Sequence, residues 1–291
     1  MLKDTKANKI FLIVLVLLLA LSFTLMKGWE GRGRATRSDQ DFEFKANDSL
    51  KVRTIANDVV IEVDDSLKRA TVSIGGNERD VLSVLKTTSN LSVEVKPKTN
   101  WFFRFFSYAP STLMIALPSS SLGSLDVSTI SGDIQILHPM KAQTMEIKST
   151  SGEVDFLTLE AKESLKVFTT SSSLSGSEAK SLRDLEFSTI SGDIDVQKIT
   201  AKEIVLKSIS SGVEAEVEIL SSGSLTASST SGGLELDLRA NADLHVKAST
   251  TSGTITFNER DQSGRSAELQ TGTAQEKVHL SSVSGSIEVT Y

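Results

Sequence analysis

The sequence repeats a short phrase built around Ser-Gly about every 20 residues. "STISGDI" occurs at 128–134 and again, unchanged, at 188–194, and related phrases continue to the C-terminus. The step stays at 20 or 21 residues as far as Gly253. The last step, to Gly285, is 32 residues long and contains a polar segment, 258–277, which predicts a surface excursion or an irregular extra coil. Self-similarity of this period indicates a repeat protein.

Apolar and polar residues alternate within each repeat. In the first clear unit Leu125 and Val127 precede the phrase, and Ile134 and Ile136 follow it. Alternation with a period of two is typical of half-buried β-strands and not of helices. Each unit is therefore expected to hold two short strands with the Ser-Gly phrase at the corner between them.

Glycine at such a corner is expected to supply a positive φ, which a β-branched residue could not hold cheaply. Ser172 replaces glycine in one unit, and the hydroxyl residues before the glycines are expected to align as ladders. Asn57 is placed at a corner because asparagine tolerates the left-handed region. The predicted structural corners are Asn57, Gly132, Gly152, Gly192, Gly212, Gly232, Gly253 and Gly285.

A unit of two short strands cannot bury its apolar face alone, so the units must stack, each about 4.8 Å above the last. The sequence thus predicts an all-β fold, a β-solenoid or β-helix of about 20-residue coils. A β-sandwich is the alternative, because regular strand spacing is common to both.

The first 37 residues form a region of their own. Residues 10–26 are 17 residues without a charge, at the short end of what spans a bilayer, and Lys27 and Trp29 follow where such side chains anchor to headgroups. A cleaved signal peptide is the alternative, but no convincing A-x-A site follows the run. We expect a single-pass cell-membrane protein whose body lies outside the cytoplasm.

Three regions are expected along the chain: an N-terminal signal anchor and tether at 1–37, an irregular β region at 38–118, and regular solenoid repeats at 119–291. Three of the four prolines lie in 97–118, where we place the boundary between the second and third regions.

The composition excludes several classes of function. The chain has no cysteine, and its three histidines fall in no metal-ligand spacing. Beyond residue 37 there are 24 Lys/Arg against 35 Asp/Glu, and such an acidic body argues against a nucleic-acid partner. No nucleophile with recognisable flanks is present. We expect no catalytic residue, no cofactor and no bound metal.

Acids that follow the corners are the sharpest candidates for chemistry. Asp133, Glu153 and Asp193 come directly after the glycine, and Asp155 and Asp195 lie two residues further on. Stacked carboxylates repel one another, and Ca²⁺ would relieve the repulsion. Because other repeats place Ser, Gly or Thr at the first of these positions, a solvated face is the favoured interpretation.

An aromatic segment, "WFFRFFSY", occupies residues 101–108. One interpretation is a capping segment that covers the open end of the stack. The other is an exposed patch for lipid, glycan or a protein partner. The candidate interaction patch consists of Trp101, Phe102, Phe103, Phe105, Phe106 and Tyr108.

The chain resembles a known family through three features taken together. These are the N-terminal apolar run, the lead-in "LMIALPSSSLGSLDVSTISGDIQI" at 113–136, and the recurring "SG-D/E/S-I/V" units. Over residues 42–291 this is similar to the bacterial putative-adhesin repeat family (domain of unknown function 4097, DUF4097). The resemblance implies membrane-anchored proteins associated with cell-envelope stress systems. It brings no catalytic residues.

We therefore expect a non-catalytic, membrane-anchored structural or interaction protein of the cell envelope, with a role in envelope-stress signalling or adhesion. Its expected partners are the membrane, through residues 10–26, and an envelope protein or glycan. A carbohydrate-binding or carbohydrate-active β-helix protein is the alternative. An enzyme of that kind would need acids beside Arg or Lys in a groove.

Overall fold

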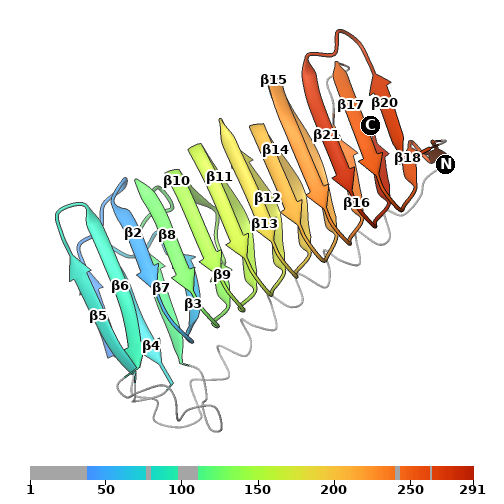
Figure 1. Cartoon of the computed structure of the whole chain (residues 1–291). Helices are drawn as coiled ribbons and strands as arrows, with labels where there is room; N and C mark the ends of the chain where they lie inside the picture. Colours follow the sequence, from blue (N-terminus) through green and yellow to red (C-terminus); the bar gives the residue numbers. More distant parts are fainter. Residues whose placement is uncertain (1–37, 77–79, 98–110, 240–242, 263) are drawn as a thin grey trace. The chain divides into compact units, whose positions relative to one another are not determined.

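The computed structural model describes residues 38–76, 80–97, 111–239, 243–262 and 264–291, and every helix-or-strand element in these ranges is a strand (Figure 1). No helix in the described ranges has the length and apolar character needed to cross a membrane. The expected span at 10–26 and the aromatic segment at 101–108 lie outside the described residues. Residues 37–291 form one compact unit.

The strands form two parallel faces of a solenoid. Along the first face the order is β6 (Asn90–Pro97), β2 (Ser49–Arg53), β8 (Ser124–Thr129), β10 (Met140–Ser149), β11 (Val154–Thr169), β13 (Asp184–Thr189), β14 (Ile194–Ser208), β15 (Val213–Ser229), β21 (Glu276–Ser282) and β17 (Leu244–Thr250).

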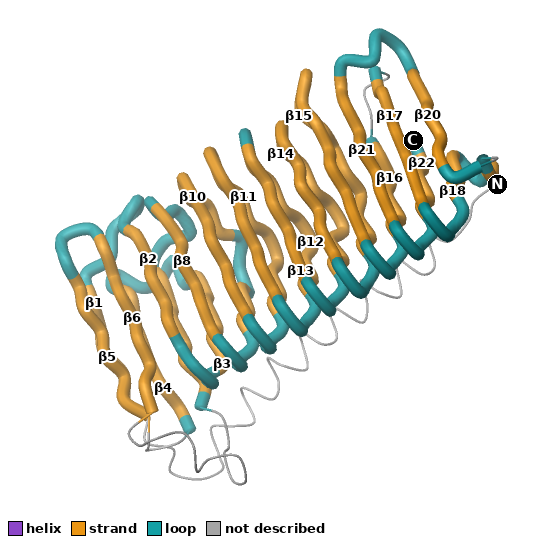
Figure 2. Tube along the Cα trace, viewed as in Figure 1, coloured by secondary structure: helices purple, strands orange, loops and turns teal. Residues whose placement is uncertain are grey.

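Along the second face the order is β7 (Thr112–Leu117), β3 (Asp58–Val63), β9 (Ile134–Ile136), the first part of β11, β12 (Leu174–Ser181), the first parts of β14 and β15, β16 (Leu234–Leu238), β22 (Ile287–Thr290) and β18 (Ile255–Phe257). The turns that join the two faces line up along one edge of the stack (Figure 2). This arrangement confirms the predicted β-solenoid, and a sandwich does not fit its in-register parallel pairing.

Apolar columns fill the space between the faces. Leu125 stands in register with Met145, and Met145 with Leu165, and all three are buried. Because the pleat directs alternate side chains inward, each coil adds apolar residues to the same columns. Burial of one such side chain contributes about 1.5–3 kcal/mol, and stacking alone makes this burial possible.

The coil order departs from the chain order at both ends. β21 and β22 lie between β15/β16 and β17/β18, so the last coil in the sequence is inserted before the preceding one. In the same way β2 and β3 lie between β6/β7 and β8/β9. In the long step before Gly285 the chain thus leaves the terminal coil and returns to form the coil between that one and the rest of the stack.

Antiparallel strands cap both ends. β5 (Asp80–Lys86) pairs with β6, and β4 (Ala70–Gly75) pairs with β7 and with β1 (Ser38–Phe42). At the other end β20 (Ser266–Gln270) pairs with β17, and β19 (Arg260–Asp261) with β18. The polar segment 258–277 supplies both strands of this second cap.

The corner glycines do not have the positive φ that we predicted. Among the described glycines only Gly76, Gly264 and Gly272 do, and none of them is a corner. Asn57, which we placed at a corner for its tolerance of the left-handed region, does not have a positive φ either. Glycine is needed instead because consecutive coils approach closely at this point. A Cβ added to Gly192 would lie 2.0 Å from the carbonyl oxygen of Ser172, and one on Gly152 would lie 1.8 Å from that of Gly132.

One predicted corner is displaced by a single residue. Val213 stands in register with Ile194, which puts Ser211, and not Gly212, in the column with Gly192. A Cβ on Gly232 would meet the carbonyl oxygen of Ser211, whereas one on Gly212 would meet nothing nearer than 3.5 Å. The predicted corner at Gly212 is therefore wrong. In "SSG" Ser211 takes the place of the corner glycine, and Gly212 takes the place of the residue that follows it in the other units.

Buried hydroxyls form the predicted ladder beside the corners. The hydroxyl oxygen three residues before a corner accepts from its backbone N–H, as Thr189 does from Gly192 at 2.9 Å and Ser149 from Gly152 at 2.9 Å. Where the corner is Ser172, the Thr169 hydroxyl instead donates to the carbonyl oxygen of Ser172 at 2.6 Å. These bonds satisfy polar groups that would otherwise be buried without partners.

Candidate functional site

A column of β-branched side chains runs along the corners and faces solvent. Each member lies two residues before its corner, and all are exposed except Thr170, which is half-buried. Ile130 is 51% exposed and Ile190 is 46% exposed. In stacking order the column is Ile55, Ile130, Thr150, Thr170, Ile190, Ile209, Thr230, Val283 and Thr251.

Except after Ile55, where Ala56 follows, the next residue in each coil adds a parallel column of exposed serines. Its members are Ser131, Ser151, Ser171, Ser191, Ser210, Ser231, Ser284 and Ser252. The backbone N–H of each serine donates to the carbonyl oxygen of the β-branched residue one coil before, as Ser191 does to Thr170 at 2.9 Å. We call the two columns together the corner ridge.

The corner ridge is placed by the fold but is not needed to bury the core. Five of the nine large apolar side chains that are exposed among the described residues belong to it, which makes it the main apolar surface of this part of the chain. Its methyl and hydroxyl groups recur at the coil spacing of about 4.8 Å. Contiguous exposed apolar surface marks sites of interaction. Our sequence reasoning missed this ridge, although the recurring Ile, Thr or Val two places before the corner was a visible signal.

The acids that follow the corners have a structural role. Asp133 Oδ1 accepts from the backbone N–H of Glu153 at 2.9 Å, and Asp193 Oδ1 accepts from that of Gly212 at 2.9 Å. Each of these carboxylates thus bonds to the coil that follows it, which is more than the solvated face we favoured.

A second acidic column lies on the outer surface of the second face. Asp195, Glu214, Glu235 and Glu288 stand in register on consecutive strands and border a shallow hollow of about 380 Å³. Partial burial raises the pKa of Glu214, with Asp195 adding to the effect, and burial together with the neighbouring acids raises the pKa of Glu235. None of the described residues that line the hollow is a lysine or an arginine.

Within the described ranges, no group of three or more His, Asp or Glu side chains is placed to hold a metal ion. A second hollow, at the C-terminal cap, is bordered by Lys247, Glu268 and His279. Its single carboxylate, Glu268, bonds to His245 at 2.5 Å, and this bond lowers the pKa of Glu268, helped by Lys247. Glycoside hydrolysis needs a pair of carboxyl groups flanking the bond, which this hollow does not offer.

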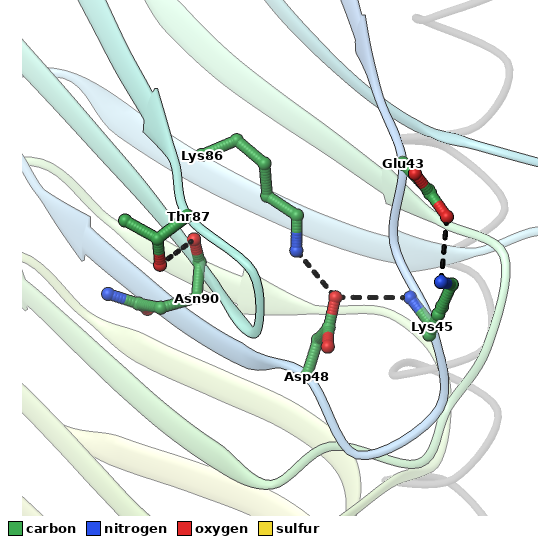
Figure 3. Close-up of polar contacts among 6 residues, drawn as sticks. All are labelled: Glu43, Lys45, Asp48, Lys86, Thr87 and Asn90. Atoms are coloured by element: carbon green, nitrogen blue, oxygen red, sulfur yellow. Dashed lines mark hydrogen bonds and ion pairs between the residues drawn. The ribbon is translucent and has the colours of Figure 1, made fainter.

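A polar cluster closes the solenoid near the N-terminal cap (Figure 3). Lys86 Nζ lies 2.5 Å from Asp48 Oδ2, and the side chains of the pair are 18% and 9% exposed. The same Asp48 oxygen accepts from the backbone N–H of Lys45 at 3.2 Å, and the ammonium lies 5.4 Å from the ring centre of Phe44. Asp48 thus has partners on both sides, as a buried carboxylate requires.

The remaining predicted site residues are distributed as follows. The corner residues Asn57, Gly132, Gly152, Gly192, Gly232, Gly253 and Gly285 lie in the corner column. The aromatic patch Trp101, Phe102, Phe103, Phe105, Phe106 and Tyr108 lies outside the described residues.

Comparison with known proteins identifies a family. The model of the Toastrack DUF4097 family matches residues 47–290. No curated protein matches the sequence.

Several solved structures are similar to the chain at low sequence identity. A putative adhesin from Bacteroides fragilis has 11% identity and a TM-score of 0.48, over 87% of this chain and 97% of that one. A putative adhesin from Parabacteroides distasonis has 10% identity and a TM-score of 0.44, over 88% and 98%. A putative lipid binding protein from the same species has 16% identity and a TM-score of 0.40, over 88% and 98%.

Proposed function

The chain belongs to the Toastrack DUF4097 family, and from this premise we propose that it is a non-catalytic interaction protein of the cell envelope. In this proposal residues 10–26 anchor it in the cell membrane and the solenoid stands outside the cytoplasm. It presents surface to an envelope protein or glycan, in support of adhesion or envelope-stress signalling.

The corner ridge is the observation that carries the proposal. A solenoid needs a buried apolar side chain at each inward position, but it gains nothing from Ile130, Ile190 or Ile209 in solvent. Because these residues recur in register over many coils, they form one extended surface and not isolated exceptions. A long linear surface fits an extended partner better than it fits a small substrate.

Two kinds of partner match the chemistry of the ridge. A protein strand or helix could cover the β-branched methyl groups, with the serines at the rim. A linear glycan presents hydroxyls and C–H faces alternately along its length, which fits the alternating hydroxyl and methyl columns. This second fit keeps carbohydrate binding as an alternative. In the hollow at the C-terminal cap, the single carboxylate already bonds to His245, which disfavours carbohydrate cleavage there.

Charge substitutions on the corner ridge test the proposal. Ile130→Lys with Ile190→Lys changes two exposed side chains, so folding should be preserved. Leu182→Lys is the matched control, because Leu182 is 51% exposed but lies outside the ridge. Material crosslinked to the full chain in intact cells should be lost in the ridge variant and retained in the control. Equal capture by both variants would refute the ridge as the binding surface.

The anchor is tested separately. Protease added to intact, wall-stripped cells should digest the body of the full chain while leaving its first residues with the membrane. A protected body, or a body released into the medium with its N-terminus beyond Met26, would refute the anchored topology.

A further inference from the structure

We propose that the molecule self-associates through β5, which pairs antiparallel with β5 of a second copy to join the two solenoids at their N-terminal caps. Among the described residues β5 pairs only with β6, so its other edge presents backbone N–H and C=O groups without a strand partner. Such an edge is a template for pairing with another chain, and proteins usually protect it.

The other three terminal strands carry protection that β5 lacks. β1 presents Asp39 and Asp41, β20 presents Glu268 at its centre, and β19 is only two residues long. If β1 or β20 paired with itself about its centre, these acids would face one another across the junction. Like charges directly opposite on neighbouring strands are destabilising. Among the described strands, three of the four free edges thus carry a feature that opposes such pairing.

β5 presents an uncharged outer surface instead. Its outward side chains are Val81, Ser83 and Leu85, and Val81 and Leu85 are 42% and 65% exposed. Leu85 is the most exposed large apolar side chain among the described residues. Among the described residues of one copy, nothing accounts for these two side chains, because the inward residues Leu82 and Val84 make the contact with the core.

The sequence of β5 is complementary to itself when reversed. It reads "DVLSVLK" from Asp80 to Lys86. Antiparallel pairing about Ser83 would set Asp80 opposite Lys86, Val81 opposite Leu85, and Leu82 opposite Val84 of the second copy. Apart from Ser83, which faces Ser83 of the second copy, every cross-strand pair is then apolar with apolar or acid with base, which identifies a second copy as the fitting occupant. A two-fold axis through Ser83 makes the contact isologous and closed.

The backbone of β5 is in the correct phase for this register. The N–H of Thr87 donates to the carbonyl oxygen of Asn90 in the turn to β6, so Thr87 and, by alternation, residues 85, 83 and 81 bond toward β6. Leu82 and Val84 consequently direct their N–H and C=O groups to the free edge. In the dimer Leu82 would exchange both bonds with Val84 of the second copy.

Asp80 and Lys86 keep the partners that they have within one copy. Lys86 bridges Asp48, and Asp80 accepts from Asn57 Nδ2 at 2.9 Å and from Ser111. Their contribution to pairing is therefore that opposite charges face each other. One short strand pair is a small contact, and confinement of both copies to a membrane would raise its effective concentration. The pairing does not depend on what the corner ridge binds, whereas this gain in effective concentration rests on the proposed membrane anchor.

A single cysteine at the two-fold axis tests the register. The chain has no cysteine, so Ser83→Cys introduces a single thiol that can form a disulfide only with the same thiol of a second copy. In a pair that lacks mutual backbone bonds the Cα atoms lie about 4.5 Å apart, within the roughly 4.4–6.8 Å that a disulfide allows. Gln40→Cys, at the centre of the acid-protected β1, is the matched control.

The full-length variants are oxidised in membranes by dissolved oxygen with a copper catalyst and separated without reductant. We expect several-fold more disulfide-linked dimer from Ser83→Cys than from Gln40→Cys. Equal or absent cross-linking at Ser83 overturns the proposal, including the case in which the chain covers its own β5 edge.

Charge variants in the Ser83→Cys background distinguish this register from general stickiness. Val81→Lys should lower the dimer roughly tenfold, because the two-fold axis places an unpaired charge against Leu85 at two positions. Adding Leu85→Glu to that variant sets opposite charges face to face and should restore the dimer. A dimer that survives Val81→Lys, or that the double variant does not restore, overturns the proposed pairing.

Discussion

Gly192→Ala should destabilise the solenoid although it adds only one methyl group. The new Cβ would lie 2.0 Å from the carbonyl oxygen and 2.2 Å from the carbonyl carbon of Ser172 in the preceding coil. Ordinary contacts of a Cβ are longer by more than an ångström, so one of the two coils must move. Bonds on both sides of the corner oppose this movement: Ser191 donates to Thr170 at 2.9 Å, and Leu174 donates to Asp193 at 2.9 Å.

The size of the effect follows from these two constraints. Forcing a methyl group into packed structure typically costs about 1–3 kcal/mol. Weakening one of the flanking bonds adds about 1 kcal/mol. We therefore expect the free energy of unfolding to fall by about 2–4 kcal/mol. Ser172 shows that one corner can hold a Cβ. Its hydroxyl donates at 2.5 Å to the carbonyl oxygen of Gly152, a bond that an alanine at position 192 could not make to offset the close approach.

Gly212→Ala is the matched control. Its Cβ would meet nothing nearer than 3.5 Å, and Gly212 is not among the residues with positive φ. Reduced freedom of the unfolded chain should make this variant equal to the parent or more stable by up to about 1 kcal/mol. Denaturant titration of residues 38–291, followed by circular dichroism, measures both variants. Equal midpoints for the two would refute the close-approach explanation of the corners.

Three further results are expected. Lys86→Met should lower the free energy of unfolding by about 3 kcal/mol, since it leaves the buried Asp48 carboxylate without its cation. Lys148→Met, which removes the cation of an exposed pair with Glu146, should cost less than about 1 kcal/mol. Similar losses for the two variants in thermal melts would show that Asp48 does not depend on Lys86. Glu214→Gln should raise stability at pH 7 by a few tenths of a kcal/mol, because the raised pKa of Glu214 means that the folded state binds more protons and loses stability as pH rises from about 4 through the folded pKa. The gain should vanish below about pH 4, where the carboxyl is protonated in both states, and a gain that persists in acid would point to another cause. A chelator should leave the melting temperature unchanged, and a fall that Ca²⁺ reverses would reveal a cation on the acidic column.

The repeating features of the fold could be read from the sequence because each repeats the same local chemistry. The alternation around Leu125 and Val127 predicted the inward columns, and the hydroxyl before each Ser-Gly predicted the ladder seen at Ser149 and Thr189. The inserted last coil was not predictable in this way. Its neighbours in the stack, β15 and β17, are determined by packing between distant segments, and no local pattern in 276–290 predicts them.

The errors at the corners have a physical origin as well. Glycine is compatible both with positive φ and with close approach of two backbones, and the letter alone does not distinguish these causes. Gly212 was misplaced because only the register of Val213 with Ile194 reveals that Ser211 occupies the column. The corner ridge was not predicted because Ile130 and Ile190 lie in the turns, outside the alternating strand positions that were compared between repeats.

Photo-crosslinking from single positions around one coil, in intact cells, tests the central claim most directly. A photoreactive side chain would replace Ser191 on the corner ridge, Glu186 on the outer surface of the first face, or Leu182 at the far end of that coil, all of them positions with side chains accessible to solvent. If the corner ridge is the surface through which this protein acts, a discrete crosslinked partner should appear from Ser191 and not from Glu186 or Leu182. A partner captured from Glu186 or Leu182 while Ser191 gives none would contradict the claim that the ridge is the interaction surface.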